Sequence, residues 1–82
     1  MQTDQQEQQL RDVMAAKRTE YLRLNEEYDR LMEQAHALPH GSGEMVQLLS
    51  ALNVFGPQVF AALREYHDAV EQLTEFYRTA AT

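Results

Sequence analysis

The feature that most constrains this chain is an uncharged stretch of 19 residues, Met45 to Leu63, in a sequence whose charged residues make up 24% of the total. Near its middle lies Gly56-Pro57, the pair most able to interrupt a helix. The stretch carries more apolar surface than one neighbouring helix covers. Something else must therefore cover the remainder.

The residues before this stretch have the pattern of one long amphipathic helix over 4–38. Apolar residues recur at alternating spacings of three and four, and no glycine or proline interrupts them. Thr3 or Asp4 can cap the start of this helix, and Pro39 ends it because a residue before proline disfavours the helical conformation. Ten positions form the stripe, eight of them apolar: Glu7, Leu10, Met14, Lys17, Tyr21, Leu24, Tyr28, Leu31, Ala35 and Leu38.

A second helix over about 44–80 shows the same alternation, and the short loop before it predicts an antiparallel hairpin. Ser42 or Gly43 can cap this helix. The phase of the stripe is the same on both sides of Gly56-Pro57, so we expect a kink or short break that keeps the chain direction rather than a reversal that makes three helices. Eleven positions form its stripe: Met45, Leu49, Leu52, Gly56, Val59, Leu63, Tyr66, Val70, Leu73, Tyr77 and Ala80.

The position of the loop also predicts which residues lie side by side. Folding the hairpin about residue 41 or 42 places residues whose numbers add up to 83 or 84 at the same level. Tyr28 then lies opposite Gly56, where the missing side chain makes room for the ring. Likewise, Glu7 lies close to Tyr77, so that a polar stripe residue meets a phenol.

The second helix has apolar residues in excess of those the hairpin uses. A further stripe repeats every seven residues, with two more apolar residues on the other flank: Leu48, Phe55, Ala62, Ala69 and Phe76, then Val46 and Phe60. We expect the protein interface to consist of Val46, Leu48, Phe55, Phe60 and Phe76. Three arrangements are open, namely the core of a homodimeric four-helix bundle, a surface for a different protein, and internal burial if the chain folds back at Gly56-Pro57.

Composition and charge limit the classes of partner. The 82 residues form one small domain (1–82) without cysteine, so we expect a homodimer or another protein partner to add stability. A net charge of −6 disfavours nucleic acid and anionic membrane surfaces as partners. The N-terminal sequence lacks the features of a signal peptide, and the apolar stretch contains Gln47, Asn53 and Gln58. We expect a cytoplasmic protein without a membrane span.

No group of residues predicts catalysis or metal binding. Glu33 and His36 have the Glu-x-x-His spacing of di-iron bundles, but both lie on the outer face of the predicted helix. His36 and His40 are separated by a helix-breaking proline, and no histidine is placed to activate Ser42 or Ser50. We therefore expect no enzymatic activity, no cofactor and no metal.

These expectations favour a small non-enzymatic protein-interaction module, such as an adaptor, a chaperone-like protein or a regulatory subunit. One alternative is an acidic inhibitor from a phage or mobile element that blocks a basic partner. Its contact face would be the acidic residues of the first helix, although arginines are interleaved with them. A second alternative is a structural component of a secretion apparatus.

Overall fold

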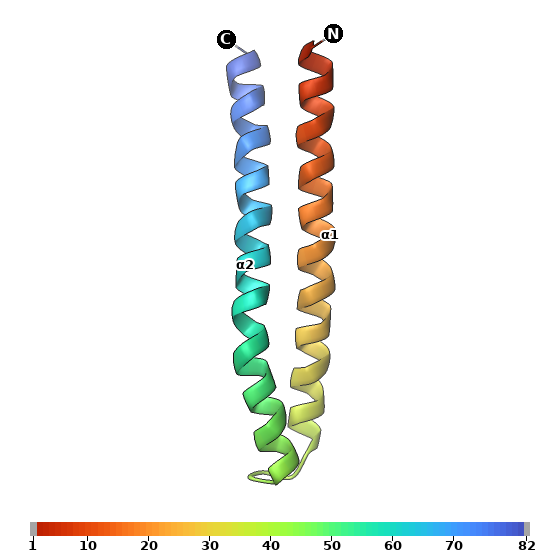
Figure 1. The fold of residues 1–82 in the computed structure, drawn as a ribbon, viewed down its shortest axis with the longest axis vertical. Helices are drawn as coiled ribbons and strands as arrows, with labels where there is room; N and C mark the ends of the chain where they lie inside the picture. Colours follow the sequence, from red (N-terminus) through yellow and green to blue (C-terminus); the bar gives the residue numbers. More distant parts are fainter. Residues whose placement is uncertain (1, 82) are drawn as a thin grey trace.

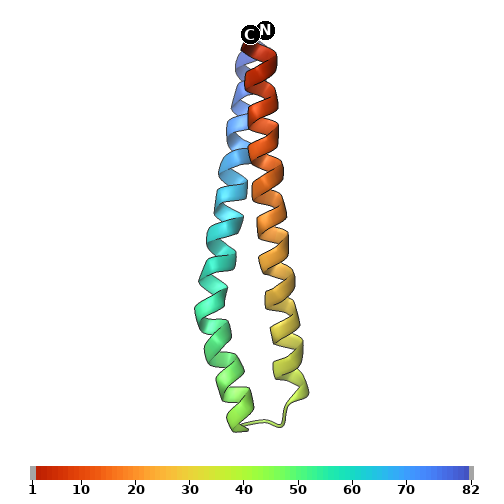
Figure 2. The ribbon, with the colours of Figure 1, turned by 45° about the vertical axis from the view of Figure 1, so that its right-hand side comes forward.

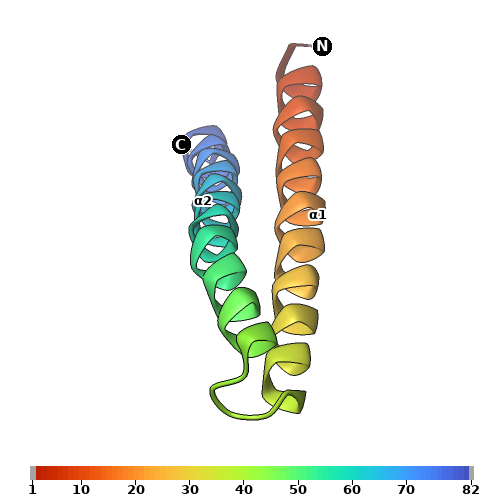
Figure 3. The ribbon, with the colours of Figure 1, turned by 60° about the horizontal axis from the view of Figure 1, so that its bottom comes forward.

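A computed structural model describes residues 2–81, with side chains from Asp4 to Ala81. Two helices, α1 (Gln2–Ala37) and α2 (Gly43–Ala80), lie antiparallel and contact each other along their length (Figure 1). The start of α1 and the end of α2 lie at one end of the rod, and the loop lies at the other (Figures 1 and 3). The molecule measures 60 × 16 × 15 Å. The predicted all-α hairpin is confirmed for the described residues.

The start of α1 differs from the prediction. The helix already includes Gln2, so Asp4 lies in its first turn and is not the N-cap. The capping box expected at Asp4 is therefore wrong, and the side chain of Thr3 lies outside the described residues. Asp4 still stabilises this end, because a carboxylate in the first turn interacts favourably with the helix dipole.

The loop between the helices is a tight turn followed by a helix cap. The backbone N–H of Ser42 donates to the carbonyl of Pro39 at 3.1 Å, and Gly41 has a φ of +76°. A positive φ at this position favours glycine, since other residues adopt it at a cost. Ser42 then caps α2, because its Oγ accepts the N–H of Met45 at 3.1 Å. Of the two caps predicted, the structure uses Ser42.

Helix α2 passes through Gly56-Pro57 without a break, so the chain keeps its direction and residues 2–81 form two helices rather than three. Pro57 is exposed and lies five residues, roughly 140° around the helix, from buried Leu52. Its ring therefore points away from α1. Proline has no N–H for the carbonyl of Asn53, an exposed residue that water reaches. Figure 2 shows α2 bowed, with its convex side away from α1.

The predicted pairing between the helices is confirmed at Tyr28. A methyl group built on Gly56 would lie 3.6 Å from Cε2 of Tyr28, so the ring packs against the glycine as expected. Lys17 Nζ lies 3.1 Å from Glu65 Oε1, and the rings of Tyr21 and Tyr66 stack with centroids 6.4 Å apart. Residues at one level thus have numbers that add up to about 82–87, which includes the predicted sums.

The stripe of α1 is confirmed. On α2, eight of the eleven predicted positions are buried or half-buried, but the helix is rotated somewhat toward Ala62, so that Leu49, Tyr77 and Ala80 are exposed. All ten predicted positions of α1 are buried or half-buried, with Leu24 and Ala35 the most enclosed. On α2, Ala62 and Ala69 are each only 5% exposed, although they belong to the stripe expected to be left uncovered. The buried residues of α2 are Leu52, Ala62, Ala69 and Leu73.

The rotation has a steric reason. Leu49 and Tyr77, which were expected to face α1, are exposed instead. The stripe of Leu49 and the stripe of Ala62 lie roughly 50° to either side of Leu52, so a small turn of α2 brings Ala62 toward α1 and exposes Leu49 and Tyr77, while Gly56, Leu63 and Val70 stay half-buried. The small side chains of Ala62 and Ala69 let the two helix backbones approach closely, which the larger Leu49 and Tyr77 would prevent.

Candidate protein-interaction surface

The rotation of α2 divides the five predicted interface residues into two groups. Leu48, Phe55 and Phe76 lie on the stripe of Ala62 and are half-buried. Val46 and Phe60 remain exposed. Around the axis of α2 they lie on one side of the buried Leu52, and the stripe of Ala62 lies on the other. The expectation that all five lie on uncovered surface is therefore correct only for Val46 and Phe60, because α1 partly covers the other three.

The exposed apolar residues near Phe60 form one continuous side of α2. Val46 is 54% exposed, Leu49 is 44% exposed, and Phe60 is 73% exposed. Viewed down the axis of α2, all three lie roughly 60–120° around from Leu52, on the same side. We call this side the apolar flank, and it consists of Val46, Leu49, Gly56, Phe60 and Leu63.

A groove of about 170 Å³ opens between the helices beside the apolar flank. It exists because Gly56 has no side chain to fill the space next to the ring of Tyr28. None of its lining residues is charged. The groove, which we call the Tyr28 groove, is lined by Tyr21, Asn25, Tyr28, Gly56, Val59, Phe60 and Leu63.

The opposite side of the hairpin is polar. A hollow beside Ala62 is lined by charged residues as well, among them the ion pair of Lys17 with Glu65. Near the termini, Phe76 borders a second hollow together with Gln72 and Glu75. The two sides of the hairpin thus differ in character, and Phe60 is the exposed apolar residue that lines the Tyr28 groove.

The acidic residues on α1 are partly neutralised by neighbouring arginines. Arg23 forms an ion pair with Glu20 at 2.6 Å, and Arg30 forms one with Glu27. The hydrogen bond from Arg23 lowers the pKa of Glu20, and that from Arg30 lowers the pKa of Glu27. All four residues have side chains that are at least 41% exposed, so these pairs form a solvated face.

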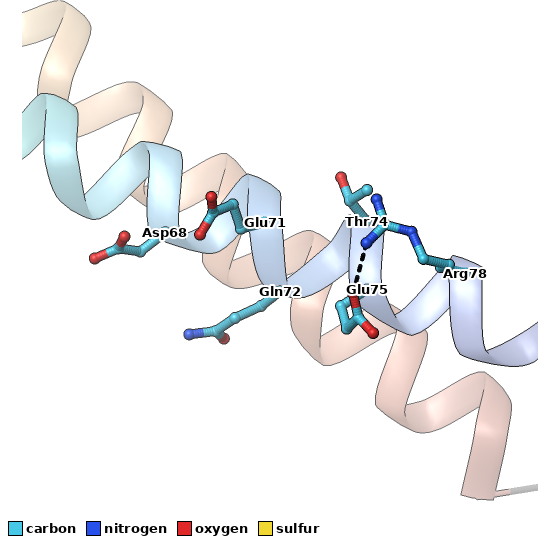
Figure 4. Close-up of a pocket in the computed structure, with 6 residues that line it drawn as sticks. All are labelled: Asp68, Glu71, Gln72, Thr74, Glu75 and Arg78. Atoms are coloured by element: carbon cyan, nitrogen blue, oxygen red, sulfur yellow. Dashed lines mark hydrogen bonds and ion pairs between the residues drawn. The ribbon is translucent and has the colours of Figure 1, made fainter.

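A further hollow lies on α2 near the C-terminus (Figure 4). Its six lining residues come from one helix and point outward, so it has no second wall. Arg78 already pairs with Glu75 at 2.9 Å. Within residues 4–81, no three His, Asp or Glu side chains gather closely enough to hold a metal ion. The lining residues are Asp68, Glu71, Gln72, Thr74, Glu75 and Arg78.

The fold changes the pKa of Tyr77, near the C-terminal end of α2. A hydrogen bond with Glu7, together with partial desolvation, raises the pKa of Tyr77 above its usual value. The positive charge of Arg11 lowers the pKa of Tyr77 and so opposes this shift. The contact confirms the predicted pairing of Glu7 with Tyr77 at the open end of the hairpin.

By length and composition alone, α2 is long and apolar enough to cross a membrane. Only 11% of the apolar window in this helix is buried inside the hairpin. This low share shows that α1 leaves most of the window exposed.

Comparison of the chain with protein-family models, curated proteins and solved structures gives no match. The surface is therefore interpreted from its own chemistry. Sequence reasoning identified Val46 and Phe60 but missed that Asn25 and Tyr21 help form a groove beside them. The available signal was the pairing of Tyr28 with Gly56, since a glycine within an apolar stripe leaves a gap in the surface.

Proposed function

We propose that this chain is a non-enzymatic protein-interaction module that works as a homodimer, in which two hairpins pack their apolar flanks together into a four-helix bundle. The observation that supports this proposal best is Phe60, which is 73% exposed within an uncharged stretch and lies beside an apolar groove. Exposed aromatic residues next to uncharged concave surface are typical of protein interfaces.

Covering Phe60 supplies a substantial driving force. At 73% exposure it leaves roughly 150 Å² in water, taking about 200 Å² for a whole aromatic side chain. At about 25 cal/mol per Å², burying that surface is worth up to roughly 4 kcal/mol per copy. Val46 and Leu49 add to this in the same direction.

The distribution of charge also supports pairing along this flank. Each copy carries a net charge of −6, so two copies repel each other wherever carboxylates meet. Between Met45 and Leu63 there is no charged residue, so the flank is the part of α2 along which two acidic chains approach at the lowest electrostatic cost. The alternative of an acidic inhibitor is weakened, because Arg23 and Arg30 occupy two carboxylates of its contact face.

Sedimentation equilibrium tests the proposal directly. We expect a dimer at micromolar concentration, and we expect the Phe60→Ser variant to be monomeric while circular dichroism still shows helix. Val54→Ser is the matched control, since Val54 is 69% exposed on α2 but lies roughly 200° from Leu52, off the flank. A folded wild-type monomer at about 100 μM, roughly a hundred times a micromolar dissociation constant, would contradict the homodimer.

Membrane binding is the second candidate function, and the length and apolar composition of α2 favour it. The polar residues Gln47, Asn53 and Gln58 within the stretch argue against a position in lipid. Flotation with phosphatidylcholine vesicles separates the two candidates. We expect the chain to stay with the soluble fraction.

A further inference from the structure

We infer that the two hairpins of the dimer lie antiparallel, with Phe60 of each copy seated in the Tyr28 groove of the other. This inference rests on the proposed function, because it names the contact through which the homodimer forms. It goes further in assigning an orientation, a register and a specificity-determining residue.

The first argument is that the flank complements itself. The projecting ring of Phe60 and the gap at Gly56 are four residues apart, roughly 6 Å along the helix. A two-fold axis across α2 at the level of Gln58 exchanges positions 56 and 60, so each ring reaches the other copy's gap. Closed two-fold dimers use such self-complementary surfaces. In a parallel dimer, by contrast, the two Phe60 rings would meet and both gaps would remain empty.

The second argument is the size and chemistry of the groove. Its volume of about 170 Å³ is close to that of an apolar cavity of about 150 Å³ that accommodates benzene. The rings of Tyr21 and Tyr28 line it and offer edge-to-face contacts to an entering phenyl ring. Gly56 allows close approach because its Cα carries no side chain.

The third argument is electrostatic. In this register, positions of α2 whose numbers add up to 116 face each other, and the flank-side pairs include Val46 with Val70, Leu49 with His67, Asn53 with Leu63, and Gly56 with Phe60. Glu71, on the same side near the end of the facing stretch, meets the uncharged Met45. The neighbouring column of α1, at sevenfold spacing, carries no carboxylate over the length that faces the other copy, where it consists of Arg11, Arg18, Asn25 and Met32; Asp4 of the same column lies beyond that length. Two acidic copies can therefore meet here without opposing negative charges.

The fourth argument is area. Pairing about residue 58 keeps positions 43–73 of the two α2 helices opposite each other, a length of roughly 46 Å. With the full 15 Å width of the hairpin, a face of that length has a projected area of roughly 700 Å², of the order of the roughly 800 Å² per partner that stable interfaces bury. A second copy therefore provides a sufficient interface without any additional partner.

The described chain has no cysteine, so single cysteine variants report orientation cleanly. Leu49→Cys and His67→Cys are mixed in equal amounts under mild oxidation. In the antiparallel dimer we expect the mixed disulfide to exceed either homodisulfide at least fivefold. A parallel dimer would give mainly the two homodisulfides and would overturn the inference.

The seat of Phe60 is tested by NMR on a mixed dimer in which one copy is isotopically labelled. We expect intermolecular nuclear Overhauser effects from the Phe60 ring to Gly56 Hα and to the Tyr28 ring. We also expect Phe60→Ala to weaken dimerisation at least tenfold and Val54→Ala to change it less than twofold. Phe60→Leu should weaken dimerisation by less than Phe60→Ala does and by more than Val54→Ala does.

The outcomes separate this inference from the proposed function. The seating of Phe60 would be overturned, while the homodimer stands, by a wild-type dimer that lacks the intermolecular nuclear Overhauser effects. A dimer whose affinity Phe60→Ala leaves unchanged would have the same consequence. A folded wild-type monomer would overturn both. A monomer that floats with phosphatidylcholine vesicles would also overturn both and would assign the flank to lipid.

Discussion

Replacing Pro57 with alanine should stabilise the folded hairpin and weaken the dimer. Pro57 lies inside α2 with its ring pointing away from α1, so its removal costs no contact between the helices. Alanine restores an N–H that can donate to the carbonyl of Asn53 and so completes the helical ladder. The monomer therefore gains a hydrogen bond and loses a steric clash.

The size of the gain follows from two opposing terms. Proline in a helix interior is about 3 kcal/mol less favourable than alanine. Proline also restricts the unfolded chain, which offsets about 0.4–1 kcal/mol of that difference. The expected net stabilisation is thus about 2 kcal/mol, which raises Tm by about 8–16 °C for a domain of this size.

Urea unfolding followed by circular dichroism measures this change, in the Phe60→Ser background so that dimerisation does not contribute. Ser50→Ala is the control, because Ser50 is exposed one heptad earlier on the same side of α2 and should change the stability by at most about 0.5 kcal/mol. If Pro57→Ala is neutral or destabilising, the ring of Pro57 takes part in native packing and the reasoning is refuted. In a chain that keeps Phe60, Pro57→Ala should straighten α2. The Phe60 ring would then turn away from the groove of the other copy, and the dimer dissociation constant should rise.

Three further predictions concern the hairpin itself. Leu73→Ala removes a buried side chain and should cost about 2–3 kcal/mol of unfolding free energy in urea, whereas Leu22→Ala, at an exposed position, should cost less than about 1 kcal/mol; equal losses would contradict the assigned core. Gly41→Ala should lower Tm because of the positive φ, at a cost of about 1–2 kcal/mol, and Gly41→Asn should lose less; identical losses would show that φ is not the cause. The hydrogen bond with Glu7 raises the pKa of Tyr77, so its contribution to stability is complete below pH 10.0 and is lost as the pH rises through the higher folded-state pKa. Urea unfolding between about pH 9 and 11 should therefore show a steeper decline for the wild type than for Tyr77→Phe, and parallel declines would refute this coupling.

Much of the fold could be predicted from the sequence, because it depends on local rules. The three-and-four spacing of apolar residues specifies the helices, and Pro39 with the glycines after it specifies a short loop. Once the loop is placed, arithmetic along two antiparallel helices sets their register, which is why the contact between Tyr28 and Gly56 was predictable. The start of α1 was not, because helix ends depend on weak capping preferences that several residues satisfy equally.

The candidate surface depended on a choice that local pattern does not make. On α2, the columns of Leu49 and of Ala62 are both apolar and lie symmetrically about Leu52, so the spacing of apolar residues is equally consistent with either one facing α1. Tertiary packing decides between them, because Ala62 and Ala69 let the helix backbones approach closely and gain more contacts. That rotation lets α1 partly cover Leu48, Phe55 and Phe76, three of the five residues expected to be free, and it leaves Phe60 exposed beside the gap at Gly56.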